Sequence, residues 1–184
     1  MRVKKIDYGS NGVNTTTYYV GNFIQIINSS GIYNETYYYD SINLVGMKDV
    51  NNKMKYYHPD HLGSTTLVTN QSGGIDENTF YLPFGKVLSG GSERFGFTGK
   101  ELDKETNLNY YGSRYYNQDL RHFIQADTII SDIYNPQSLN HYSYVLNNPY
   151  KYVDKTGKVL EPVSAITTFV FITVVVSGVV DYLQ

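Results

Sequence analysis

The stretch "YYHPDHLGSTTLVTNQSGG", residues 56–74, alternates strand-forming and turn-forming residues in a pattern that recurs through much of the chain. Its tyrosine pair and the run from Thr65 to Thr69 are typical of strands, because aromatic and β-branched side chains fit a pleated, half-buried surface. Gly63 and the "SGG" at 72–74 interrupt these runs with residues that favour turns. The stretch therefore predicts strands separated by short turns.

Tyrosine pairs extend this rhythm toward the N-terminus. They begin at Tyr18, Tyr37 and Tyr56, so successive pairs are 19 residues apart. Such an interval holds two strands of about six residues and two short turns. The segments "NSSG" and "KDVNNK" supply turn residues between the pairs. We expect antiparallel hairpin repeats, which need neighbouring repeats to bury their apolar face.

The composition favours a β protein and narrows the classes of partner. The chain has 20 Tyr, no Trp and 17% charged residues, and its 41% hydrophobic content is enough for a core. A net charge of −2 gives no basic surface for nucleic acid. Without cysteine there is neither a disulfide nor a thiolate zinc site. We expect no nucleic-acid partner, no metal and no cofactor.

Two later segments depart from the strand pattern. "NPQSLNHYSYVLNNP", residues 135–149, predicts a short helix over 136–146, because Pro136 suits a first helical turn and apolar residues follow at helical spacing. Residues 163–180 carry no charge. They match a membrane helix near its minimum length, or strands buried inside a protein. We expect a C-terminal hydrophobic helix there.

Four quoted segments resemble a known family. "YYHPDHLGSTTLVTNQSGG", "YLPFGKV", "RFGFTGKELDKETNLNYYGSRYYNQDLRHFIQAD" and "SLNHYSYVLNNPYKYVDKTG" are similar to the RHS (YD-repeat) associated core domain. That family includes polymorphic toxins, C components of Tc toxins and teneurins, and the resemblance implies a hollow β-shell around a variable C-terminal polypeptide. It divides the chain into degenerate YD-type repeats (1–55), core domain (56–157) and a hydrophobic C-terminal segment or cargo remnant (158–184).

The histidines near residue 60 invite a metal or catalytic interpretation, which the strand geometry disfavours. His58 and Asp60 point to one face of a strand and His61 to the other, so the three do not converge on one ion. A triad of Ser64, His61 and Asp60 fails for the same reason. We interpret these residues as the polar end of a strand that turns at Gly63. "GFTGKE" at 96–101 lacks the residues of a P-loop.

The family resemblance implies one catalytic pair. In self-cleaving members two aspartates near the end of the core cut the chain, and by residue match these are Asp127 and Asp154. Two close carboxylates cannot both ionise easily, so one can act as a general acid while the other activates water. This chain departs from the family at Lys155, Lys158 and His122. A structural interpretation of both aspartates, as turn or cap residues, stays open.

The sequence supports three functional hypotheses. The first is a structural segment that closes an RHS-type shell and presents the hydrophobic C-terminal peptide, with the upstream YD-repeat shell or that peptide as partner. The second is an aspartic self-protease acting near Lys158, and the third is a tyrosine-rich module that binds carbohydrate or protein at a cell surface. We expect an extracellular or cell-surface location, with 163–180 as a membrane anchor. The start of this chain shows no signal peptide, because Asp7 precedes any apolar run.

The shell hypothesis makes one packing expectation. Aromatic residues gather in a region of few charges, and exposing them would create a large apolar patch. We expect substantial burial of Tyr110, Tyr111, Tyr115, Tyr116 and Phe123.

Overall fold

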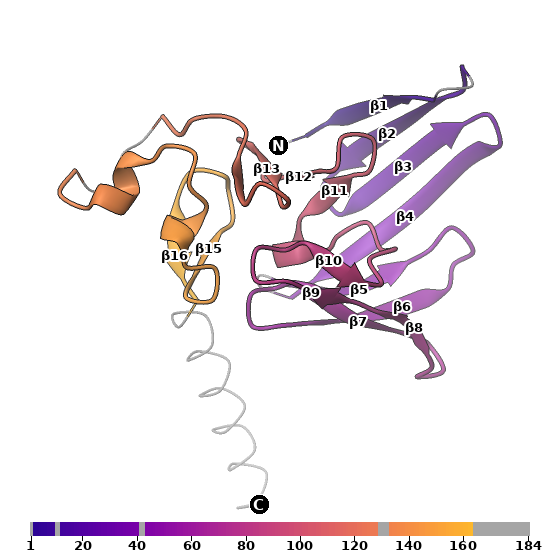
Figure 1. The fold of residues 1–184 in the computed structure, drawn as a ribbon. Helices are drawn as coiled ribbons and strands as arrows, with labels where there is room; N and C mark the ends of the chain where they lie inside the picture. The colour runs from indigo at the N-terminus through magenta and orange to yellow at the C-terminus, as the bar shows by residue number, and fades with distance from the viewer. Residues whose placement is uncertain (1, 10–11, 41–42, 129–132, 164–184) are drawn as a thin grey trace, which may run out of the picture.

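An eight-stranded antiparallel sheet, the large sheet, dominates the computed structural model (Figure 1). The structure describes residues 2–9, 12–40, 43–128 and 133–163. Each strand pairs with the next one in the chain, so the sheet is a simple meander. Its strands are β1 (Lys4–Tyr8), β2 (Asn14–Val20), β3 (Phe23–Asn28), β4 (Gly31–Tyr39), β5 (Leu44–Lys48), β6 (Met54–Pro59), β7 (Thr65–Asn70) and β8 (Ile75–Asn78).

The tyrosine pairs lie on alternate strands, which confirms the hairpin repeats. They fall on β2, β4 and β6, and β3 and β5 complete the hairpins between them. Neighbouring strand residues point to opposite faces, so each pair straddles the sheet. Tyr37 and Tyr57 are buried on the inner face, whereas Tyr38 and Tyr56 are exposed on the other. Two of the pairs therefore supply a core residue each, and Tyr19 of the first pair is partly buried against the same cluster.

The chain after β8 forms small antiparallel sheets that we call together the C-terminal layer, the described residues of 80–163. Its strands are β9 (Phe80–Tyr81), β10 (Val87–Ser89), β11 (Glu101–Asp103), β12 (Leu108–Tyr110), β13 (Tyr115–Asn117), β14 (His122–Phe123), β15 (Tyr152–Asp154) and β16 (Leu160–Pro162). They pair as β9 with β10, β11 through β14 in order, and β15 with β16. A short 3₁₀ helix, Phe97–Gly99, precedes β11.

Two hydrophobic clusters hold these parts together. The first lies on the inner face of the large sheet, where the Phe95 ring packs edge-on against Tyr37 with ring centroids 5.0 Å apart. The second lies in the C-terminal layer and also includes Leu62 from the turn between β6 and β7. Edge-to-face ring pairs of this kind each contribute about 0.5–1.5 kcal/mol beyond their buried area. The buried aromatic members of the second cluster are Phe97, Tyr111, Tyr116, Phe123 and Tyr144.

The expected burial of the aromatic residues is confirmed. Tyr111, Tyr116 and Phe123 are fully buried, and Tyr110 and Tyr115 are half-buried. Tyr110 and Tyr115 stand opposite each other on β12 and β13, with ring centroids 5.4 Å apart. The aromatic residues of this region thus form its core.

The short helix expected over 136–146 is wrong in length and type. A 3₁₀ helix, Pro136–Leu139, begins at the expected proline, and Asn135 caps it by accepting a hydrogen bond from the Gln137 backbone. The chain then becomes extended at Asn140, whose side chain accepts a hydrogen bond from the Tyr142 backbone and so competes with helix continuation. A second 3₁₀ helix spans Val145–Asn147.

The apolar spacing that favoured a helix does not create a buried face. Leu139 and Tyr142 are about half exposed, whereas the buried residues between 136 and 146 are Ser138, Tyr144 and Val145. Burial therefore follows the turns of the chain instead of a helical period.

Several sequence predictions remain open. The hydrophobic segment 163–180 lies outside the described residues except for Val163. Among the described residues, no helix has the length and apolar character needed to cross a bilayer. The large sheet continues across residue 55, since β6 spans Met54–Pro59. The division into 1–55, 56–157 and 158–184 stays a prediction.

The buried tyrosines make the fold sensitive to alkali. Burial raises their pKa above 10.0 because it disfavours the phenolate. Their stabilising contribution is fully present below pH 10, where the unfolded phenols are neutral, and is lost as the pH rises toward the folded-state pKa. We expect the free energy of unfolding to fall steeply above pH 10. The tyrosines concerned are Tyr37, Tyr57, Tyr111, Tyr116 and Tyr144.

A single substitution tests this origin. Tyr116→Phe should reduce the slope of the unfolding free energy between pH 10.5 and 12 by about 1.4 kcal/mol per pH unit, measured by urea denaturation. Phe97→Leu is the matched control, since it weakens the same cluster without removing a phenol. An unchanged slope in Tyr116→Phe would contradict the assignment.

Candidate functional site

Arg114 brings together the two aspartates that the sequence singled out. It immediately precedes β13 and is buried. Its Nη2 lies 3.0 Å from Asp127 Oδ2 and 3.3 Å from Asp154 Oδ2. Those oxygens are therefore separated by no more than the sum of these two distances. The structure thus gathers Asp127 and Asp154 around one guanidinium.

Asp154 organises the turn that follows β15. Its Oδ1 accepts backbone hydrogen bonds from Thr156 at 3.0 Å, Gly157 at 2.7 Å and Lys158 at 3.2 Å. Gly157 has a φ of +74°, which glycine adopts without the strain a side chain would add. Asp154 therefore holds the turn at 154–158 together.

The other contacts of Arg114 fix its position. Its Nε donates to Gly157 O at 2.6 Å and its Nη1 donates to His141 O at 3.2 Å. The guanidinium carbon lies 3.6 Å from the centroid of the Phe123 ring, within cation–π distance. Asp127 is tied to the same place because its backbone N–H donates to His141 O at 2.8 Å. Arg114 thus links three separate segments of the C-terminal layer.

A pocket of about 400 Å³ adjoins this cluster. Arg114, Asp127 and Asp154 line it together with Lys158 and Val159. The carboxylates therefore share one cavity with the part of the chain near which the family resemblance implies cleavage.

The guanidinium decides what this arrangement favours chemically. The guanidinium forms an ion pair with each carboxylate, whereas a general acid–base pair of carboxyl groups must share a proton. The cluster as it stands is therefore an ion-paired structural centre. The sequence analysis did not identify Arg114. Its position beside the aromatic residues of "GSRYYN" could have indicated burial, and a buried arginine requires acidic partners.

The stretch around residue 60 has the predicted turn at Gly63, whose φ is +83°. Asp60 Oδ1 accepts hydrogen bonds from the Leu62 and Ser64 backbones, and His58 Nε2 lies 3.0 Å from Thr69 Oγ1 on the neighbouring strand. Within the described ranges, no group of three or more His, Asp or Glu gathers for a metal ion. The contacts of Asp60 and His58 are those of a turn and a strand pair.

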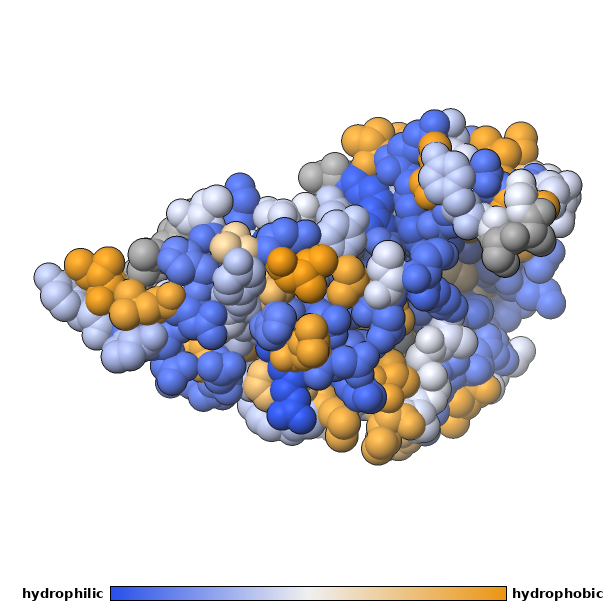
Figure 2. Space-filling view, turned by 45° about the horizontal axis from the view of Figure 1, so that its top comes forward, coloured by the Kyte–Doolittle hydropathy of each residue, from blue (hydrophilic) through white to orange (hydrophobic). Residues whose placement is uncertain are grey.

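The tyrosine-rich binding module stays a hypothesis. Tyr38 and Tyr56 are exposed on the outer face of the large sheet, opposite Gly46 on the strand between them. On the face shown in Figure 2, hydrophobic residues lie in small patches between hydrophilic ones. Single exposed apolar residues are normal on protein surfaces and do not mark a site.

Comparisons with known proteins agree with the geometry. The teneurin YD-shell family model matches residues 22–150. The chain is 35% identical over 113 residues to salivary gland surface protein 1 of Aedes aegypti, covering 57% of this chain and 3% of that protein. It is 30% identical over 115 residues to toxin subunit YenC1 of Yersinia entomophaga, covering 58% of this chain and 11% of that protein. The chain thus spans only a small part of the relatives it matches.

Solved structures share the fold. The crystal structure of TcdB2-TccC3 superposes with a TM-score of 0.72 at 24% identity, covering 85% of this chain and 8% of that one. A Photorhabdus luminescens Tc holotoxin pore structure carrying the mutation TccC3-D651A gives a TM-score of 0.68 at 23% identity, with the same coverage. At this identity the likeness establishes the architecture.

The ion-paired centre makes a stability prediction. Arg114→Met leaves the buried Asp154 and the partly buried Asp127 without the cation that they share, so we expect a loss of about 3–5 kcal/mol in the free energy of unfolding, measured by urea denaturation. The matched control is Lys86→Met, because Lys86 pairs with Asp119 at 2.7 Å but both side chains are about half exposed. Exposed pairs contribute about 0–1 kcal/mol.

A second variant separates lost charge from lost packing. Adding Asp127→Asn to Arg114→Met should restore part of the stability, because it removes one of the two negative charges that Arg114 contacts. Equal costs for Arg114→Met and Lys86→Met would show that Arg114 does not hold the cluster.

Proposed function

Because this chain belongs to the teneurin YD-shell family, we propose that it forms part of the wall of an RHS/YD-repeat β-shell and closes that shell. The observation that carries the proposal is the large sheet with the C-terminal layer packed against its inner face. The hairpin repeats form the wall of the shell. The C-terminal layer fills the space on the inner side of that wall. The role is structural, and its partner is further YD-repeat shell.

The edge strand β1 gives the wall a place to continue. The Tyr19 N–H donates to Val3 O at 2.9 Å, so the backbone groups of Val3 point toward β2. Backbone groups alternate in direction along a strand, so those of Lys4 and Ile6 point away from β2. An exposed row of this kind is a template for another strand. A neighbouring YD repeat therefore pairs with β1.

The relatives indicate where such a shell works. One is named a toxin subunit and another a salivary gland surface protein. Under this proposal the chain belongs to a secreted or cell-surface protein. The shell then retains or presents the C-terminal segment, residues 158–184.

A self-protease is the second candidate. It is favoured by one observation, the shared pocket of Asp127, Asp154 and Lys158. Catalysis at this pocket requires the two carboxylates to share a proton, and Arg114 opposes that state. The structural role therefore ranks first.

Edge pairing can be tested directly by hydrogen exchange. Adding a polypeptide of YD repeats from this family should slow amide exchange at Lys4 and Ile6, whose N–H groups point outward. Ile6→Pro removes one of these N–H groups without removing a β1–β2 hydrogen bond, and should abolish binding. Ile6→Val keeps the N–H and should bind normally. Equal binding by the proline variant, or no protection at β1, would overturn the pairing.

The mass of the expressed chain distinguishes the two candidates. Because Arg114 pairs with both carboxylates, we expect one species of 21.0 kDa by intact-mass spectrometry. A fragment ending near Lys158 that disappears in Asp127→Asn and in Asp154→Asn would instead establish the self-protease.

A further inference from the structure

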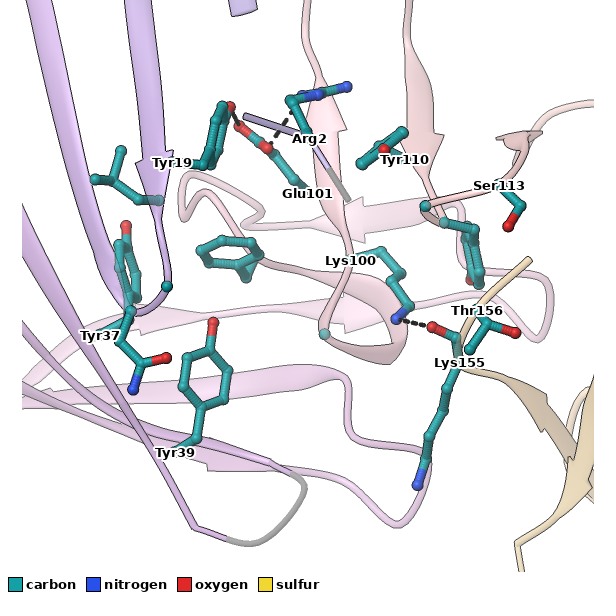
Figure 3. A pocket seen from close by; sticks show the side chains of 17 residues that line it. Arg2, Tyr19, Tyr37, Tyr39, Lys100, Glu101, Tyr110, Ser113, Lys155 and Thr156 are labelled. Carbon is teal, nitrogen blue, oxygen red and sulfur yellow. Dashed lines mark hydrogen bonds and ion pairs between the residues drawn. The ribbon is translucent and has the colours of Figure 1, made fainter. Parts of the chain in front are cut away.

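A second pocket, of about 490 Å³, lies between the large sheet and the C-terminal layer (Figure 3). Tyr19, Tyr37 and Tyr39 line it from the sheet side, and Lys100 and Lys155 line it from the layer. Its volume is typical of sites for small molecules. Its aromatic lining consists of Tyr19, Tyr37, Tyr39, Phe95, Tyr110 and Tyr111.

Three charged residues of this lining are neutralised by partners. Arg2 Nη1 lies 3.1 Å from Glu101 Oε2, and Arg2 also pairs with Asp103 at 2.6 Å. The other oxygen of Glu101 accepts from Tyr19 and from Arg94. Lys155 Nζ pairs with Glu161 at 3.5 Å at the exposed rim. None of these groups offers a free charge to the cavity.

Lys100 differs from them. Its Nζ donates one hydrogen bond, to Lys155 O at 2.7 Å, and lies 5.5 Å from the centroid of the Tyr111 ring (Figure 3). Among the residues that the structure describes, no carboxylate lies within ion-pair distance of it. Burial lowers the pKa of Lys100, as expected for an ammonium that has lost water without gaining a counter-charge.

The two carboxylates that favour the Lys100 ammonium electrostatically, those of Asp154 and Glu161, are engaged elsewhere, and Glu161 pairs with Lys155. Asp154 favours the ammonium electrostatically, but its Oδ2 contacts Arg114 and its Oδ1 accepts three backbone N–H groups. An ammonium has three donors, so two of those on Lys100 have no acceptor among the described residues. A partly buried cation with free donors, beside an aromatic cavity, is complementary to an anion with an apolar body.

We infer that this pocket binds a small organic acid carrying an aromatic ring, with Lys100 Nζ holding the carboxylate and the tyrosines enclosing the ring. The site lies where the C-terminal layer packs on the large sheet, but its lining includes neither β1 nor Arg114, so ligand titration tests it separately from edge pairing and from self-cleavage. Lys100 is then a binding residue whose missing counter-charge comes from the ligand.

Phenylacetate is the probe for the full chain, and phenylacetamide is its neutral partner of nearly the same shape. By calorimetric or NMR titration we expect phenylacetate to bind at least about tenfold more tightly, because the charged hydrogen bond is lost in the amide. In Lys100→Met, which keeps the apolar stem, the two compounds should bind equally weakly. Lys155→Met, at the rim of the same pocket, should retain the preference.

Equal binding of the two compounds by the unmodified chain would overturn the inference, and so would the absence of binding. That comparison needs no variant and therefore does not depend on how Lys100→Met folds. Retained phenylacetate affinity in Lys100→Met would also overturn it. Chemical-shift changes confined to residues outside the pocket would have the same consequence.

Discussion

The fold depends on how the C-terminal layer covers the inner face of the large sheet, because that face carries charged as well as apolar side chains. The inner face of the large sheet carries the partly buried Glu35 and Lys55 beside its buried tyrosines, so an apolar cover would leave these charges unpaired. The C-terminal layer supplies the complements: Arg94 Nε lies 3.3 Å from Glu35, and Lys55 Nζ lies 2.7 Å from Glu93. Tyr57 also donates to Glu93 at 2.6 Å. These ion pairs fix the position of the C-terminal layer on the large sheet, because a shift of the layer would leave the charges without their partners.

The same requirement to pair enclosed charges operates inside the C-terminal layer. There a buried cation, Arg114, lies between acidic segments that are distant in sequence. Arg114 also donates hydrogen bonds to the backbone carbonyls of Gly157 and His141, so it fixes the backbone of these segments as well as pairing with the carboxylates. The aromatic cluster beside it excludes water and strengthens each of these hydrogen bonds. Packing and pairing therefore depend on each other in this layer.

The sequence predicted what short-range periodicity controls. The tyrosine spacing specified the hairpins, and turn residues specified their connections, because both depend on neighbouring residues. Arg114 was missed because its pairing with Asp127 and Asp154 is created by tertiary folding. The predicted helix already ends at Asn140, and Val145 and Leu146 then take positive φ values of 44° and 52°. No local signal predicts that conformation, because bulky side chains disfavour it.

Arg114 and Lys100 show how the partners of an enclosed cation distinguish a structural role from a binding role. Both are enclosed cations of the C-terminal layer, but Arg114 contacts two carboxylates, whereas the described residues give Lys100 a single carbonyl. A charge paired within the chain gains nothing from an outside anion, because its donors are already used. An unpaired one keeps its desolvation cost until a counter-charge arrives. The chain's own partners therefore make the Arg114 cluster a structural centre and leave the Lys100 pocket available for recognition.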